Sequence, residues 1–314
     1  MSRVGRIVRH VKALLGLVFA LAVLAGCAAQ PREENFAGLV DIGDGRRLFL
    51  NCQGTGSPTI FIIPGKGSYA EAWNVVVATD DPIRLSPYDI IGQANLQPSP
   101  TATQPTVAKT TRVCAYDRPN TRQDGSDRST PVAQPHSMQD DVDDIVKLVA
   151  AAGLSTPMVV AAHSYGGLIA DLLARTHPEL VNGLVLVDPL SEFLPRLGRS
   201  EQDAAFNRAA RVPTPELDGE GFLAVDAYAR IKLAPPLPKV PTIVLSSDKF
   251  PPPADLGPDD YTKFQIHQAN SLLAETLLTE NVIIPGTGHN IMLYAPQVVA
   301  DKIIVLVDRI RSAP

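Results

Sequence analysis

The stretch MVVAAHSYGG, residues 158–167, decides the fold. Its first five residues are a continuous apolar run, which is typical of a buried strand. Ser164 follows in a tight turn, and a helix is predicted directly after it. This is the arrangement of a nucleophile elbow, in which the residues two before and two after the serine approach each other and must be small. Ala162 and Gly166 meet this requirement, although the usual motif has glycine at the first position.

Two further residue types suit this serine, because a serine hydroxyl needs a base and the base needs an orienting carboxylate. His289 lies in a Gly-rich loop after a predicted strand, and Asp248 directly follows another. The sequence therefore predicts a catalytic triad of Ser164, Asp248 and His289. Asp188, which ends a third predicted strand, is the alternative acid or else a cap for the next segment. The domain's other histidines are predicted to be structural or solvent-facing: His136, His163, His177 and His267.

A candidate oxyanion hole has two backbone donors. Tyr165 begins the predicted helix, where its N–H can stabilise a developing oxyanion. The second donor is expected to be the N–H of Lys66, in the Pro-Gly-Lys-Gly-Ser segment at 64–68, which we call the oxyanion loop. Its glycines allow the backbone to approach a substrate closely. The Lys66 side chain is predicted to face solvent or to attract an anionic substrate.

Eight short apolar segments are predicted strands, and segments with helical spacing lie between several of them. Near-continuous apolar strands are what a parallel sheet covered on both faces requires. The alternation after an opening hairpin predicts an α/β fold with a mostly parallel eight-stranded sheet and helices on both faces. Ser137 is the predicted N-cap of one helix, and Pro296 opens the last one. The predicted strands are 39–42, 47–51, 59–63, 112–116, 158–162, 184–187, 242–245 and 282–284.

Two stretches interrupt this pattern. Residues 79–110 are rich in Pro, Thr, Gln and Asp and have little periodicity, so they are predicted to be an insertion, and the clustered prolines indicate long ordered loops rather than disorder. Residues 189–240, the cap segment, separate two strands by more than one crossover helix needs, which predicts a small inserted cap with weak helices near 201–211 and 221–231. Its apolar residues are candidates for an acyl pocket, with core packing as the alternative role: Phe193, Leu194, Phe206, Phe222 and Tyr228.

The N-terminal residues 1–26 are predicted to be a signal peptide. Four basic residues precede an uncharged, mostly apolar run that is too short to span a membrane as a helix. The run ends in Leu-Ala-Gly-Cys at 24–27, which resembles the lipobox of bacterial lipoproteins, so Cys27 is the expected lipidation site. Plain secretion after cleavage near an alanine is the alternative. A polar tether at 27–36 then leads to one predicted domain at 37–314.

Loss of the signal peptide removes four basic residues and no acidic ones, so the net charge changes from −5 to −9. Such an acidic protein lacks the positive charge that binding to nucleic acid requires. Membrane attachment is therefore expected through the lipid at Cys27, on the outer face of a bacterial plasma membrane. Cys52 and Cys114 remain, and in an oxidising compartment they are expected to form a disulfide or to be two separate buried thiols. They do not make a metal-ligand set.

On these residues the sequence resembles the α/β-hydrolase fold superfamily across nearly all of 37–314. It is particularly similar to exported actinobacterial hydrolases with a Cys-x-Gly-x-Gly-x-Pro segment and a Cys-Ala-Tyr-Asp-Arg segment, which are present here at 52–58 and 114–118. The family's sheet order implies that the two cysteines opening these segments lie on neighbouring strands. The sequence departs from the family at Pro64, where His is frequent, and at 120–122, where Gly-x-Gly is frequent.

The resemblance implies a serine hydrolase that cleaves a carboxylic ester through an acyl-enzyme intermediate, with a small-molecule or lipid ester as substrate and no cofactor or metal. The same residues serve other acyl chemistry, namely thioester or peptide cleavage, acyl transfer and perhydrolysis. A non-catalytic binding protein on a hydrolase scaffold is the alternative of a different class. Neither insertion carries a motif that identifies the substrate.

Overall fold

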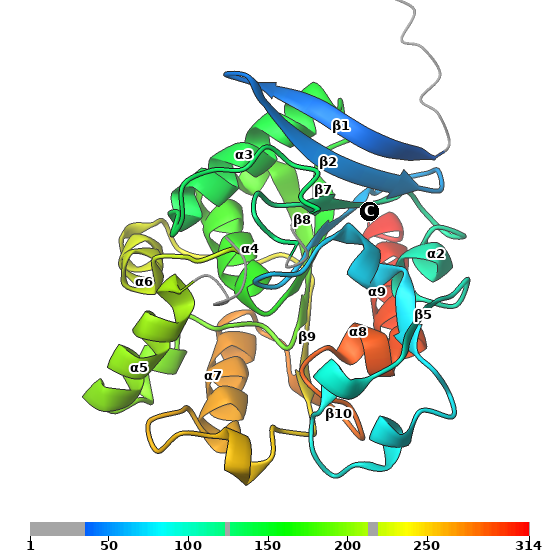
Figure 1. Ribbon diagram of the computed structural model, residues 1–314. Helices are drawn as coiled ribbons and strands as arrows, with labels where there is room; N and C mark the ends of the chain where they lie inside the picture. The colour runs from blue at the N-terminus through cyan, green and yellow to red at the C-terminus, as the bar shows by residue number, and fades with distance from the viewer. Residues whose placement is uncertain (1–34, 123–125, 213–218, 314) are drawn as a thin grey trace, which may run out of the picture. The chain divides into compact units, whose positions relative to one another are not determined.

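A computed structural model of the chain describes residues 35–122, 126–212 and 219–313 (Figure 1). The predicted signal peptide, the lipidation site at Cys27 and most of the tether lie outside the described residues. Among the described residues, none of the helices combines the length and the apolar character that crossing a membrane requires.

The fold is built on an eight-stranded sheet with the order β1-β2-β6-β3-β7-β8-β9-β10. The β1–β2 and β2–β6 pairs are antiparallel, and every other pair is parallel. Each predicted strand is present, which confirms the expected α/β sheet. The strands are β1 Phe36–Gly43, β2 Arg46–Gln53, β3 Ile60–Ile63, β6 Val113–Asp117, β7 Met158–His163, β8 Val181–Val187, β9 Thr242–Ser247 and β10 Asn281–Ile284.

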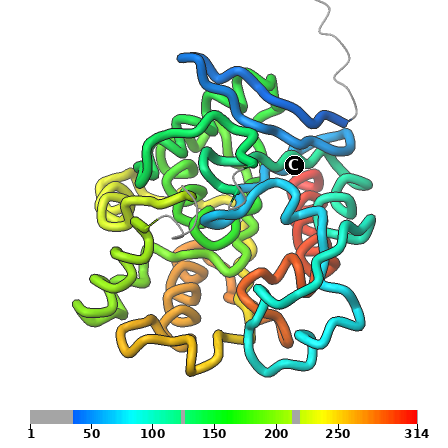
Figure 2. Tube along the Cα trace, in the orientation of Figure 1, coloured from blue at the N-terminus to red at the C-terminus, as the bar shows by residue number. Residues whose placement is uncertain are grey.

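Helices cover both faces of this sheet (Figures 1 and 2). The β3 strand has apolar side chains on both faces of the sheet, because successive residues of a strand point to opposite faces, and helices bury each face. Ile60 and Ile62 pack in the core that contains α8 and α9, whereas Phe61 and Ile63 pack in the core that contains α3, α4 and α7. The helices are α2 Thr103–Val107, α3 Met138–Ala151, α4 Tyr165–Thr176, α5 Ser200–Arg211, α6 Ala224–Leu233, α7 Lys263–Thr276, α8 Ile291–Tyr294 and α9 Pro296–Arg311.

The helix starts follow from local sequence. Ser137 caps α3: its hydroxyl accepts the Asp140 N–H, and the Asp140 carboxylate accepts the Ser137 N–H. This reciprocal pair satisfies two N–H groups of the first turn, which lack intrahelical partners. Pro296 opens α9, where its missing N–H costs no hydrogen bond. Both predicted starts are therefore confirmed.

The two insertions differ in structure. The 79–110 region contains regular structure that its lack of periodicity does not indicate. Its β5 Leu96–Pro98 pairs with β4 Val75–Val77, which precedes the region, in a two-stranded antiparallel sheet, and α2 lies near its end. Asp81 supports the turn between them by accepting the Ile83 and Asn95 N–H groups at 2.9 and 2.8 Å. The cap segment contains α5 and α6, close to the two stretches where helices are predicted.

Cys52 and Cys114 form a disulfide between β2 and β6. The two residues are direct partners in the antiparallel register of these strands, and both are buried. The disulfide prediction is confirmed, and the bond fastens the opening hairpin to the parallel part of the sheet.

Candidate active site

Ser164 stands in a strained turn between β7 and α4. Its φ of 52° and ψ of −123° lie outside the regions that non-glycine residues ordinarily occupy. The turn is tight: a Cβ at Gly166 would lie 2.4 Å from the Ile63 carbonyl oxygen and 2.8 Å from that of Pro64. The glycine is therefore required by the close approach of α4 to the end of β3, while the methyl group of Ala162 is accommodated in the core.

The structure corrects the predicted acid, because Asp188 and not Asp248 contacts the imidazole. Asp188 Oδ2 lies 2.7 Å from His289 Nδ1. The Asp188 carboxylate also accepts the N–H of Ser247 at 3.0 Å and its hydroxyl at 2.9 Å. The side chain is buried, and its backbone has a φ of 43°, a second strained position. These contacts fix the carboxylate in the orientation that an imidazole partner needs.

Asp248 has a different place in the fold. Its side chain is 47% exposed and pairs with Lys263. Its carboxylate accepts the Gly286 N–H at 3.2 Å, and its own N–H donates to the Thr287 carbonyl at 2.9 Å. Asp248 thus supports the loop that carries His289 without contacting the imidazole. The physical reason is position in the sheet: β8 is hydrogen-bonded directly to the serine-bearing β7, and β9 is one strand farther away.

Two residues hold the backbone of His289. Its N–H donates to Asp89 at 2.7 Å, and Asp89 is fixed in turn by the Tyr294 hydroxyl at 2.9 Å. The His289 carbonyl accepts a hydrogen bond from His163 Nε2 at 3.0 Å. Sequence reasoning missed both supports. Asp89 lies in the insertion without periodicity, where no pattern marks it, and His163 is the variable residue of the elbow.

The contact made by His163 fixes its protonation. A carbonyl oxygen only accepts, so Nε2 carries the hydrogen and Nδ1 is an acceptor that lacks a partner among the described residues. Burial, together with the nearby His289, lowers the pKa of His163 to about 3, so the ring stays neutral. Nδ1 lies against Gly65, where a Cβ would approach it to 2.8 Å. His163 therefore touches both the loop of His289 and the oxyanion loop.

The candidate oxyanion donors flank the serine. Tyr165 is the first residue of α4, so its N–H has no intrahelical acceptor. A Cβ at Gly65 would lie 3.0 Å from the Cβ of Ser164, which places the oxyanion loop beside the serine. The Lys66 side chain is half-buried instead of fully solvent-facing: its Nζ donates to the Ala209 and Val212 carbonyls at the end of α5, at 2.9 and 3.1 Å.

Electrostatics favour a negative Asp188 beside a basic His289. Burial alone would raise the pKa of Asp188, but hydrogen bonds from His289 and Ser247 and the charge of His289 lower it below its usual value. Burial alone would lower the pKa of His289, but the bond to Asp188 and its charge raise it above 6.5. The pair can therefore stabilise an imidazolium when a proton reaches the ring.

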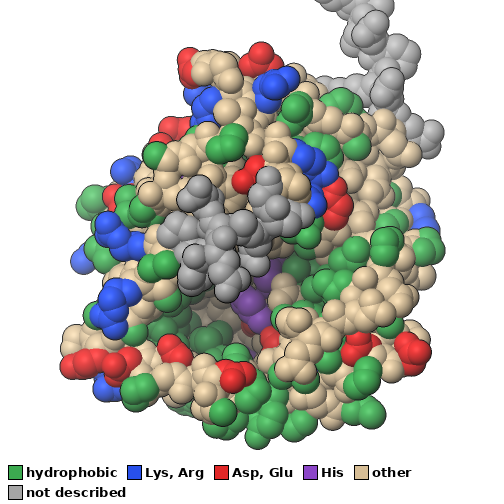
Figure 3. All heavy atoms as spheres, in the orientation of Figure 1, with side chains coloured by type: hydrophobic (Ala, Val, Ile, Leu, Met, Phe, Trp, Pro, Cys, Tyr) green, Lys and Arg blue, Asp and Glu red, His purple; other side chains and the backbone are tan. Residues whose placement is uncertain are grey.

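A cavity of about 780 Å³ lies over Ser164 and His289. Figure 3 shows this hollow, with histidine at its floor and hydrophobic side chains around it. The residues that line it include five aspartates and three lysines, so acidic side chains outnumber basic ones there. Its apolar lining includes Ile90, Leu190, Leu194, Phe206, Phe222 and Ile266. Of the pocket residues suggested by the sequence, Phe193 and Tyr228 pack in the core instead.

The alpha/beta hydrolase family model matches residues 60–302 of the sequence. The chain belongs to the alpha/beta hydrolase family. Membership agrees with the strained serine turn, the sheet order and the position of the histidine, and it supports a hydrolytic enzyme.

Several solved structures resemble this alpha/beta hydrolase. A thermophilic esterase from Thermogutta terrifontis has a TM-score of 0.54 and 16% identity, over 88% of this chain and 99% of that one. A bacterial membrane phospholipase A has a TM-score of 0.53 and 21% identity, over 96% and 99%. The carboxylesterase CesB from Bacillus subtilis has a TM-score of 0.52 and 14% identity, over 95% and 97%. At these identities the likeness shows the fold alone.

Two curated proteins match parts of this alpha/beta hydrolase. An uncharacterized protein of Schizosaccharomyces pombe is 34% identical over 85 residues, and a protein of Hormonema carpetanum named "Probable transporter efuK" is 29% identical over 185 residues. The matches cover 27% and 57% of this chain but only 15% and 22% of those proteins. The chain thus corresponds to less than a quarter of either relative.

Proposed function

We propose that this protein is a serine hydrolase that cleaves carboxylic esters through an acyl-enzyme intermediate. Ser164 is the nucleophile, His289 the general base and Asp188 the residue that orients it. The observation that carries the proposal is the 2.7 Å contact between His289 Nδ1 and Asp188, formed beside a serine held in a strained turn.

The mechanism follows from these positions. As the Ser164 oxygen attacks the ester carbonyl, His289 Nε2 takes the hydroxyl proton, and Asp188 stabilises the imidazolium. The N–H groups of Lys66 and Tyr165 donate to the oxyanion that develops on the carbonyl oxygen. His289 then returns the proton to the leaving alcohol, and water hydrolyses the acyl-enzyme by the same steps.

The cavity supports an ester with an apolar acyl group. Its lining beside the serine is aliphatic and aromatic, so a hydrocarbon chain that enters it leaves water at little polar cost. A series of acyl esters of increasing chain length tests this: kcat/KM should rise with chain length up to the size that the cavity accepts.

A fluorophosphonate probe tests the reaction class. The wild-type protein should be labelled once, at Ser164, and a Ser164→Ala variant should be neither labelled nor active. A thioesterase, peptidase or acyltransferase would also be labelled and would show its preference in the substrate series. A folded wild-type protein that the probe leaves unlabelled would instead be a binding protein on a hydrolase scaffold.

We also propose, from the sequence alone, that the protein is anchored in the bacterial cell envelope by a lipid at Cys27. The support is the lipobox-like Leu-Ala-Gly-Cys that follows an apolar run of signal-peptide length. Palmitate labelling of the wild type and its loss in a Cys27→Ser variant test the anchor. Equal membrane retention of both proteins would overturn it.

A further inference from the structure

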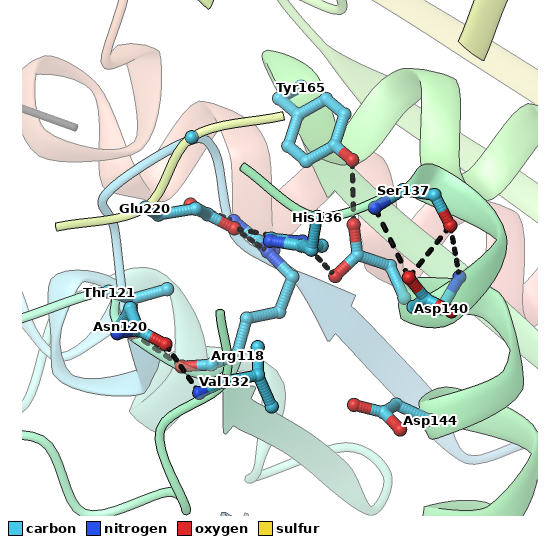
Figure 4. A network of polar contacts seen from close by, with 12 residues as sticks. Arg118, Asn120, Thr121, Val132, His136, Ser137, Asp140, Asp144, Tyr165 and Glu220 are labelled. Atoms are coloured by element: carbon cyan, nitrogen blue, oxygen red, sulfur yellow. Dashed lines mark hydrogen bonds and ion pairs between the residues drawn. The ribbon is translucent and has the colours of Figure 1, made fainter. Parts of the chain in front are cut away.

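A second group of charged side chains lies buried outside the proposed triad (Figure 4) and contacts the oxyanion loop. Its members come from four parts of the chain: the residue after β6, the loop before α3, α3 itself and the cap segment. Each is at most 7% exposed. This buried ionic cluster consists of Arg118, His136, Asp141 and Glu220.

One half of the cluster binds the backbone of the oxyanion loop. Arg118 donates from Nη1 to the Pro64 carbonyl at 2.7 Å and from Nη2 to the Gly65 carbonyl at 2.5 Å. Its Nε donates to Glu220 Oε1 at 2.6 Å, and Glu220 Oε2 accepts the Gly67 N–H at 2.6 Å. The Arg118–Glu220 ion pair therefore holds backbone groups on both sides of Lys66, the candidate donor residue.

The other half of the cluster binds Tyr165, whose N–H is the other proposed oxyanion donor. The Tyr165 hydroxyl donates to Asp141 at 2.6 Å, and Asp141 pairs with His136 Nε2 at 2.8 Å. His136 Nε2 is in turn 4.0 Å from Glu220. The Tyr165 ring stacks on Phe222, with centroids 3.8 Å apart. Both proposed oxyanion donors are thus attached to one buried group of charges.

The cluster is balanced in charge. Burial alone would lower the pKa of His136, but the charge and hydrogen bond of Asp141 raise it to about 9. Two basic side chains, Arg118 and His136, therefore face two acidic ones, Asp141 and Glu220. His136, Asp141 and Glu220 also lie close enough together to bind a metal ion, but Arg118 and Tyr165 already occupy their carboxylate oxygens. The chemistry of the cluster is that of an ion-pair network.

We propose that Arg118 and Glu220 are positioning residues, which set the oxyanion loop so that the Lys66 N–H faces the Tyr165 N–H across the Ser164 hydroxyl. This inference rests on the proposed hydrolase function. Buried ion pairs often contribute no more to stability than apolar side chains of the same shape, so stability alone gives no reason for this one. A fixed position of the two oxyanion donors is a reason for the ion pair, because oxyanion stabilisation depends on donors that are placed before the reaction.

A Glu220→Gln variant separates positioning from folding. The amide keeps the shape of the side chain but leaves Arg118 without a countercharge and weakens the acceptor for Gly67. We expect kcat per fluorophosphonate-titrated site to fall about 10- to 100-fold, while KM changes less than about threefold. Affinity for a trifluoromethyl ketone, which forms a tetrahedral oxyanion on the serine, should fall by about the same factor as kcat/KM.

A double variant, Arg118→Met with Glu220→Leu, removes both charges and leaves no buried ion unpaired. Its melting temperature should lie above that of Glu220→Gln, because no buried charge is left unpaired, although the Pro64 and Gly65 carbonyls lose their donor. The kcat should stay at least about tenfold low, because the loop has lost its fixed partners. Recovery of kcat together with stability would show that the pair serves folding only and would overturn the proposal.

The control pair is Arg46 and Asp144, which joins β2 to α3 at 2.5 Å and does not border the cavity. Arg46→Met with Asp144→Leu should leave kcat within about twofold of the wild type. A labelled, active wild type whose kcat is unchanged by Glu220→Gln would overturn the positioning role alone. An unlabelled, inactive wild type would overturn both this role and the hydrolase function.

Discussion

At the scale of single residues, the Asp188 carboxylate is the most direct point to test. Asp188→Asn replaces an acceptor with an amide that favours the wrong His289 tautomer, so kcat on an ester should fall by about 10⁴. Asp248→Asn, the matched control at the end of the next strand, should reduce kcat by less than about tenfold because Asp248 does not contact the imidazole. Circular dichroism melting of both variants checks that they are folded, and the reverse ranking of the two kcat values would contradict the assignment.

The protonation of His289 gives a second prediction at this scale. The imidazole must be neutral to take the serine proton, so kcat/KM should fall as the pH drops through its pKa. Asp188 raises that pKa, which places the midpoint of the acid limb above 6.5 in the wild type. In Asp188→Asn the midpoint should move to lower pH, since a neutral amide stabilises the imidazolium less. Initial rates measured over a pH series for both proteins decide it, and identical midpoints would show that His289 does not sense Asp188.

The sequence predicts Ser164 and His289 as partners but not the acid between them. Asp188 and Asp248 both follow apolar strands, and both lie between the serine and the histidine in the chain. Which of the two aspartates contacts the imidazole depends on the path of the Gly-rich loop that carries His289. Asp248 engages the backbone of that loop and leaves the imidazole to Asp188, a set of long-range contacts that no local pattern encodes.

At the scale of elements, the strand–turn–helix unit around Ser164 depends on one small residue. A Cβ at Gly166 would lie 2.4 Å from the Ile63 carbonyl oxygen, so Gly166→Ala must push α4 away from β3. We expect this variant to lose about 1–3 kcal/mol of unfolding free energy and most of its activity, as overpacking of a close contact does. Gly257→Ala, where the new methyl meets ordinary contact distances, is the control for urea unfolding and kcat. Equal stability of both variants would show that the turn is not close-packed.

The elements that sequence patterns predict well are those whose environment is apolar. β3 and β7 are buried on both faces, so their composition alone marks them. β5 is three exposed residues that end in Pro98, and neither composition nor periodicity indicates a strand there. The position of the Lys66 side chain could not be predicted for a related reason, since its acceptors are carbonyls at the end of α5, far along the chain.

At the scale of the whole molecule, the proposed site is assembled at one edge of the sheet from distant parts of the chain. Ser164, Asp188 and His289 follow β7, β8 and β10, and the oxyanion loop follows β3. Parallel strands bring their carboxyl ends to a common edge, which is why the sequence predicts a site there at all. The buried ionic cluster adds the cap segment to this assembly through Glu220.

The disulfide gives the last prediction, which concerns the stability of the whole domain. Cys52 and Cys114 are 62 positions apart, and the loop between them contains β3, the oxyanion loop and the small β4–β5 sheet. Constraining a loop of this length in the unfolded chain should stabilise the protein by about 4 kcal/mol. Cys52→Ala with Cys114→Ala should therefore lower the unfolding free energy in urea by about this amount. The kcat of the folded variant should stay near the wild-type value, because neither cysteine borders the cavity. Reductant should destabilise the wild type and leave the double variant unchanged, and a loss of kcat without a loss of stability would show that the bond serves the site and not the fold.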